Sequence, residues 1–186
     1  MSARIQRSVL PDPASLRRLL GERSGDLCEG CRLVDPDVQG PSGIDLLLVD
    51  EDGRPVLVDI VTDAPATVPV RLFGHADWLA ENRRLFLRAY RGDGVVRAEE
   101  PVFVFVVGRV PEGLDRALQA MSGTRTTLVR AEYVLLDGVG ELLLEPVVSA
   151  APVVSRPVAA RAGETGGRGG DLERSIDSEE VRALFA

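Results

Sequence analysis

Two acidic residues, Asp45 and Asp59, interrupt the most strand-like part of the chain. Asp45 directly precedes the apolar run 46–49, and Asp59 lies inside the apolar run 56–61. Ionised carboxylates are rarely buried without a partner, so each of them requires an explanation. If the two runs pair as a hairpin, the carboxylates come together and their oxygens suit Mg²⁺. The alternative is structural: Asp45 caps a turn, and Asp59 meets an arginine or the solvent at a sheet edge.

The segment 43–62 that carries both acids is predicted to form two strands. Both apolar runs have the length of strands rather than helices, and the second is rich in β-branched residues. Residues 50–53 read Asp-Glu-Asp-Gly, and the Asp-Gly pair favours the positive φ angles of a hairpin turn. Because the runs are almost wholly apolar, we expect both faces of the sheet to be covered.

This arrangement resembles the core of the PD-(D/E)XK, or restriction-endonuclease-like, nuclease superfamily. The shared features are an Asp that opens one strand, an acidic turn with Gly53, and an apolar strand that carries a second acid. The resemblance extends over about residues 12–146 and includes the order of elements: a helix, three strands, a helix with Trp78 and Tyr90, then a strand, a helix and further strands. It implies an α/β fold with a mixed central sheet flanked by helices, and catalytic metal ligands at Asp45 and Asp59.

The sequence departs from the family at one catalytic position. Where the family has an acidic residue, any residue and then lysine, this chain has Asp59, Ile60 and Val61, and it contains no lysine at all. In an active member the lysine ammonium positions the attacking water and stabilises charge that develops on the phosphate. Valine does neither. In an active enzyme, Arg71 from the following helix is the most plausible substitute, although arginine is a poor proton shuttle.

Length, composition and net charge favour some classes of function over others. The 186 residues are enough for one domain with a sizeable core plus a tail, and 45% of them are hydrophobic. The net charge of -7 disfavours nucleic acid, whose binding depends on basic residues that neutralise phosphates, and leans towards a protein partner. The sequence has no apolar run of membrane-spanning length and no signal-peptide pattern, which predicts a cytoplasmic protein without a membrane segment.

The remaining elements follow from apolar periodicity and turn residues. The core is predicted to be a sheet built on residues 46–50, 56–61 and 102–107 and flanked by helices that contain Leu16 and Trp78. The expected helices are 11–21, capped by Asp12, 66–91 and 111–121, and the further strands are 31–38, 126–136 and 141–148.

The helix predicted at 66–91 is the most basic segment. We expect its apolar face to consist of Leu72, Ala76, Leu79, Leu85 and Leu87, with Trp78 as a large anchor. Its arginines either meet phosphates or lie on a solvated face, and the acidic net charge favours the second. His75, the only histidine, is expected to be a hydrogen-bonded structural residue.

Cys28 and Cys31 form a single Cys-Glu-Gly-Cys motif. A zinc site needs about four Cys or His ligands, and His75 is the only further candidate of these types. The motif precedes a predicted strand rather than opening a helix, which is not typical of a thioredoxin-like pair. We expect two reduced structural thiols, with a metal or redox role as the alternative.

The chain is predicted to divide into a nuclease-like domain (1–148), a flexible linker (149–172) and a short amphipathic helix (173–186). The linker is rich in Ala, Pro, Arg and Gly and lacks apolar periodicity. The helix has an apolar stripe of Ile176, Val181, Leu184 and Phe185. So short a helix is marginal alone, so we expect it to fold into a partner's groove or to dock on its own domain.

Two functions follow from these features. The first is a protein-interaction or scaffold module built on a nuclease-like domain that has lost its chemistry and needs no cofactor. The alternative is a metal-dependent endonuclease in which Asp45 and Asp59 hold Mg²⁺ and Arg71 replaces the lysine. The position of the arginine guanidinium groups relative to Asp45 and Asp59 discriminates between them.

Overall fold

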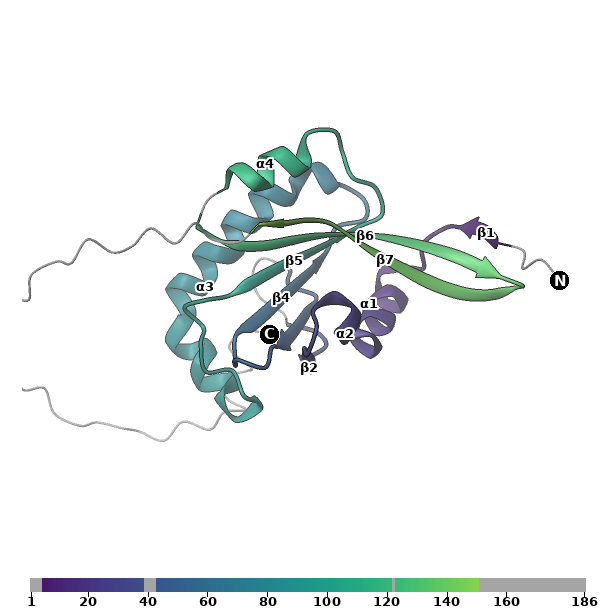
Figure 1. The fold of residues 1–186 in the computed structure, drawn as a ribbon. Helices are drawn as coiled ribbons and strands as arrows, with labels where there is room; N and C mark the ends of the chain where they lie inside the picture. The colour runs from purple at the N-terminus through teal and green to yellow at the C-terminus, as the bar shows by residue number, and fades with distance from the viewer. Residues whose placement is uncertain (1–4, 39–42, 122, 151–186) are drawn as a thin grey trace, which may run out of the picture.

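The computed structural model describes residues 5–38, 43–121 and 123–150, and these form a curled mixed sheet flanked by helices (Figure 1). The seven strands run in the order β1-β6-β5-β4-β3-β2, and β7 pairs with β6 outside this path. The strands are β1 (Ile5–Ser8), β2 (Arg32–Asp35), β3 (Leu46–Val49), β4 (Pro55–Ile60), β5 (Val102–Val107), β6 (Arg125–Leu136) and β7 (Val139–Ala150). The helices are α1 (Pro13–Glu22), α2 (Ser24–Leu27), α3 (Val68–Tyr90) and α4 (Leu114–Ala120), with short 3-10 turns η1 (Pro65–Thr67) and η2 (Arg91–Asp93).

The predicted hairpin is confirmed. β3 and β4 pair antiparallel, with Leu46 opposite Val58 and Leu48 opposite Val56. In the turn, Asp50 Oδ1 accepts hydrogen bonds from the backbone N–H groups of Asp52 and Arg54 at 2.9 and 2.8 Å. Gly53 has φ 77°, and a Cβ at this position would collide with Val96. Glycine is therefore required here by both backbone conformation and space.

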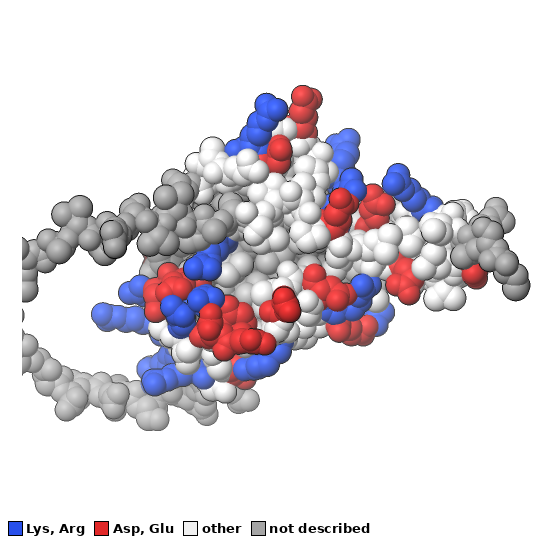
Figure 2. All heavy atoms as spheres, in the orientation of Figure 1, with Lys and Arg blue, Asp and Glu red and all other residues white. Residues whose placement is uncertain are grey.

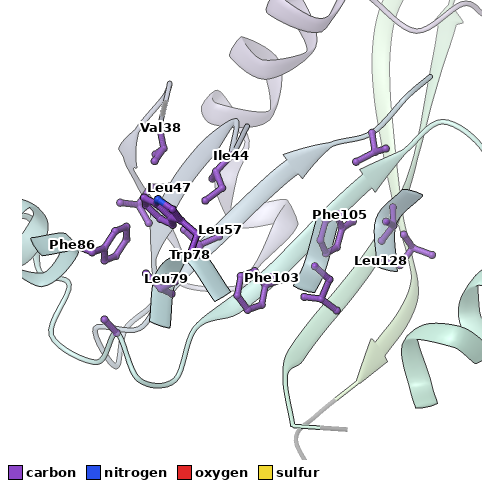
Figure 3. Close-up of a cluster of buried hydrophobic side chains, with 14 of the residues drawn as sticks. Val38, Ile44, Leu47, Leu57, Trp78, Leu79, Phe86, Phe103, Phe105 and Leu128 are labelled. Carbon is purple, nitrogen blue, oxygen red and sulfur yellow. The ribbon is translucent and has the colours of Figure 1, made fainter. Parts of the chain in front are cut away.

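The three predicted central strands lie in one sheet, as expected. β4 pairs parallel with β5, and β5 pairs parallel with β6. Parallel neighbours require crossover connections, and α3 and α4 supply them. Because side chains alternate between the faces, Leu57, Phe103 and Phe105 pack on the α3 face (Figure 3), whereas Val56, Val58 and Val104 pack on the α1 face.

The helix predicted at 66–91 is confirmed as α3, but its apolar face was partly wrong. Leu85 is 40% exposed, whereas Phe86 is fully buried. The buried positions Leu72, His75, Leu79, Phe86 and Tyr90 follow spacings of 3, 4 and 7 that keep side chains on one side of a helix. Leu85 lies one residue, about 100°, away from that stripe.

The α1–α2–β2 region confirms one prediction and corrects two. Asp12 caps α1, because its Oδ1 accepts from the backbone N–H groups of Ala14 and Ser15 at 3.1 Å each. The strand predicted at 31–38 is shorter, since β2 covers only Arg32–Asp35. Cys28 and Cys31 form a disulfide, so the prediction of two reduced thiols is wrong.

An arm of three strands projects from the body of the domain (Figure 1). It consists of β1, the outer part of β6 and the start of β7. Leu136 of β6 lies between its two neighbours, opposite Ile5 of β1 on one side and opposite Val139 of β7 on the other. The sequence did not predict β1. The predicted linker and the helix at 173–186 lie outside the described residues, apart from the first two linker positions, which belong to β7.

None of the described helices has the length and hydrophobicity needed to span a bilayer.

Candidate functional site

The hairpin brings Asp45 and Asp59 to one end of the sheet. Asp45 comes one residue before β3, and its backbone N–H donates to the carbonyl of Val58 at 2.9 Å. Its side-chain Oδ2 accepts from the backbone N–H of Ile60 at 2.8 Å. Asp59 lies between these two β4 residues, so the backbones of the two acids lie side by side in the hairpin.

Asp59 is buried and fully engaged by α3. Its side chain is 2% exposed. Arg71 donates to it in a bidentate manner, Nε to Oδ2 at 2.6 Å and Nη2 to Oδ1 at 2.7 Å. His75 Nε2 lies 2.6 Å from Oδ2 as a third partner. Arg71 and His75 are four residues apart on α3 and therefore share the helix face that meets β4. A bidentate arginine is the donor geometry that best matches a carboxylate.

His75 is buried and contacts two aromatic rings of β5 as well as Asp59. The side chain is 1% exposed, and the ring stacks with Phe103 and Phe105 at centroid distances of 6.5 and 5.9 Å. Because the partner of Nε2 is a carboxylate, Nε2 carries a proton and donates a hydrogen bond to Asp59 Oδ2. Nδ1 is buried and has no hydrogen-bond partner among the residues that the structure describes. His75 is thus a hydrogen-bonded histidine in the core, as predicted.

Arg71 connects the two halves of the site. Its Nη2 also lies 3.4 Å from the carbonyl oxygen of Gly43, close to Asp45 in the sequence. The hydrogen bonds that Arg71 donates to Asp59 raise the pKa of the Arg71 guanidinium above its ordinary value, and the charges of Asp59 and Asp45 act in the same direction, against the opposing effect of burial. The guanidinium is therefore a permanent positive charge between the loop that precedes β3 and the acid of β4.

Asp45 has an arginine of its own, from the opposite face of the sheet. Arg17 of α1 donates to Asp45 Oδ1 through Nε at 3.1 Å and Nη2 at 2.8 Å. Its Nη1 reaches Asp37 Oδ1 at 3.0 Å. The Asp45 side chain is 15% exposed, so this pair is half-buried rather than superficial. The sequence did not point to Arg17, because its contact with Asp45 depends on how α1 is rotated over the sheet.

The residues present do not fit a Mg²⁺ ion. Mg²⁺ needs oxygen lone pairs in near-octahedral geometry. Both oxygens of Asp59 and both oxygens of Asp45 already accept hydrogen bonds from protein donors, and two guanidinium charges occupy the adjacent space. Within the described part of the chain, no group of three or more His, Cys, Asp or Glu side chains is arranged to hold a metal.

Val61 occupies the position at which the resembling family has lysine. It is 5% exposed and belongs to the apolar core on the α3 face. The backbone N–H of Val61 donates to the carbonyl of Val106 at 2.8 Å, which continues the pairing of β4 with β5. Here the side chain contributes packing and no polar group. The site is thus a network of two carboxylates, two arginines and one histidine.

Comparisons with known proteins gave no counterpart: no family model, curated protein or solved structure matches this chain. The function of the chain is therefore inferred from its own residues and their geometry.

Proposed function

We propose that this chain is a restriction-endonuclease-like domain that has lost its catalytic chemistry and serves as a protein-interaction or scaffold module. One observation carries the proposal: the Asp59 carboxylate is held by Arg71 and His75, with Val61 where a catalytic lysine would stand. The acid that would bind a metal is instead the acceptor of a structural ion pair. An ion pair of this kind ties α3 to β4, and a cation at Asp59 would have to compete with three protein donors and an arginine charge.

The arrangement of elements supports the assignment to this fold type. β2, β3 and β4 pair antiparallel in sequence order, and β5 then joins β4 in parallel through α3. Helix α1 covers the opposite face of the same strands, where Leu16 and Leu20 are fully buried. The order of these elements, a helix, three strands, a helix and a further strand in a mixed sheet, is the one on which the resemblance was based.

Charge supports a protein partner over nucleic acid. The chain has a net charge of -7, and acidic and arginine side chains intermingle on the face shown in Figure 2, without a continuous basic surface there. Arg17 and Arg71, the arginines that lie next to Asp45 and Asp59 and could meet a phosphate there, already pair with these carboxylates. Phosphate binding would have to displace these partners, which lowers the electrostatic gain from binding nucleic acid.

The apolar stripe of Ile176, Val181, Leu184 and Phe185 is the proposed contact for the partner and lies outside the described residues.

A cleavage assay tests the loss of chemistry. The purified chain, incubated with Mg²⁺ or Mn²⁺ and either single- or double-stranded DNA, is expected to leave both substrates intact, because its carboxylates are engaged and no lysine is available. The Asp45→Asn variant is assayed in parallel, since it removes one candidate ligand at a half-buried position. Cleavage by the natural chain that Asp45→Asn abolishes would instead establish the metal-dependent endonuclease.

A further inference from the structure

The Cys-Glu-Gly-Cys motif joins the end of α2 to the start of β2 and plays no part in the Asp45 and Asp59 network. Its two cysteines are bonded, and their Cα atoms are 5.4 Å apart, within the usual range for a disulfide. We propose that Cys28 and Cys31 are a reversible dithiol–disulfide site that exchanges with small thiols and disulfides of the glutathione class, and that Cys28 is the sulfur attacked.

The backbone keeps the two sulfurs together in both redox states. The N–H of Cys28 donates to the carbonyl of Ser24 at 3.3 Å, and the N–H of Cys31 donates to the carbonyl of Cys28 at 3.1 Å. Gly30 makes the turn with φ 71°, and a Cβ there would collide with the side chain of Glu51. None of these contacts needs the disulfide bond. The reduced cysteines therefore remain adjacent, which favours reformation of the bond.

The two sulfurs differ in access. Cys31 is 8% exposed and belongs to the core under α1, with Leu16, Leu20 and Leu27 as members of the same cluster. Cys28 is only partly buried and packs at the margin of that cluster. Because thiol–disulfide exchange requires access to the attacked sulfur, the incoming thiolate is directed to Cys28.

A zinc site does not explain the motif. Two cysteines supply half of a tetrahedral ligand set. His75, the only histidine, is hydrogen-bonded to Asp59 through Nε2, so this nitrogen is not available as a ligand. The described residues contain no cluster of three candidate ligands. Redox exchange between the two sulfurs needs no further ligand.

The exchange balances as two substitutions at sulfur. A small-molecule thiolate attacks Cys28 Sγ, the bond to Cys31 breaks, and Cys31 leaves as a thiolate that takes up a proton. A second small-molecule thiolate attacks the outer sulfur of the mixed disulfide, which releases a small-molecule disulfide and the Cys28 thiolate. The protein disulfide gains two electrons and two protons, and the two small thiols lose them. Oxidation by glutathione disulfide is the reverse sequence.

The test is redox titration of the full chain. The protein is equilibrated in buffers that span reduced to oxidised glutathione, free thiols are alkylated, and intact masses are measured. We expect one two-electron transition in which both cysteines become alkylated together. A chain that stays wholly dithiol or wholly disulfide across the range, or a stoichiometric zinc complex in place of the disulfide, would overturn the proposal.

Single-cysteine variants test the site of attack. Each variant is treated with glutathione disulfide, and the rate at which its remaining cysteine forms a glutathione adduct is measured. Cys28, in the Cys31→Ser variant, is expected to react at least about tenfold faster than Cys31 in the Cys28→Ser variant, because Cys28 is more accessible. Circular dichroism of both variants checks that they are folded. Equal rates in two folded variants would contradict attack at Cys28. If either variant fails to fold, the rate of mixed-disulfide formation is measured on the natural chain, with the modified cysteine located by peptide mass, and an adduct at Cys31 would contradict the proposal.

Discussion

Replacing Arg71 with alanine is expected to lower the free energy of unfolding by about 3 kcal/mol, because breaking a buried ion pair leaves an uncompensated charge. The Asp59 side chain is 2% exposed, and Arg71 supplies two of its three hydrogen bonds. His75 would remain as its last donor. For a chain of this length the loss corresponds to a fall of about 9 °C in Tm, measured by calorimetry and by urea denaturation.

Two further variants make this result specific. Arg18→Ala also removes an arginine ion pair, but Arg18 and Glu22 are 65% and 57% exposed, so the expected loss is below about 0.5 kcal/mol. Arg71→Lys keeps the charge and loses the bidentate geometry, so its stability should lie between the wild type and Arg71→Ala. If Arg71→Ala and Arg18→Ala were equally stable, Asp59 would not depend on Arg71.

The double substitution Leu184→Ala and Phe185→Ala is expected to abolish co-purification of the protein partner. A few apolar anchors usually dominate the affinity of such an interface, and truncating two of them costs about 4 kcal/mol or more. The Tm of the domain should be almost unchanged, because the proposed contact of this segment is with the partner and sites that share no contacts act independently. Affinity purification and thermal denaturation of the same preparations measure both effects.

The matched control for the tail variant is Val70→Ala with Phe73→Ala. These α3 side chains are 74% and 65% exposed, so their truncation removes two exposed apolar side chains, one of them also a Phe, without altering the tail. The control should retain the partner. A fall of several degrees in Tm for the tail variant would show that the segment packs on its own domain, contrary to the proposed role in recognition.

Local patterns predicted much of the fold. The Asp-Gly turn, the two apolar runs and the Asp12 cap each depend on residues close in sequence, and each appears as predicted. Strand β1 was missed because its four residues, Ile-Gln-Arg-Ser, are all exposed and have no apolar face. It becomes a strand only through pairing with β6, where Ile5 lies opposite Leu136. No short-range pattern reports such a contact.

The sequence pointed to four residues of the candidate site, with His75 predicted as a structural residue rather than as a member of the site. Asp45, Asp59, Arg71 and His75 were all singled out, and the alternative that Asp59 meets an arginine matches the contact that Arg71 makes. Arg17 was not singled out, because its contact with Asp45 joins residues 28 apart across two elements. The sequence places Arg17 on a helix beside the buried Leu16 and Leu20, but the register of that helix on the sheet decides which acid it reaches.

The central claim is that the two carboxylates serve ion pairs rather than a metal, and titration calorimetry with Mg²⁺ and Mn²⁺ tests it most directly. We predict no saturable heat from the natural chain for either ion, because every oxygen of Asp45 and Asp59 accepts a hydrogen bond from the protein. The Asp45→Asn variant, measured in parallel, should behave identically. Saturable binding of one ion per chain that is lost in Asp45→Asn would contradict the claim and would make these acids a metal site.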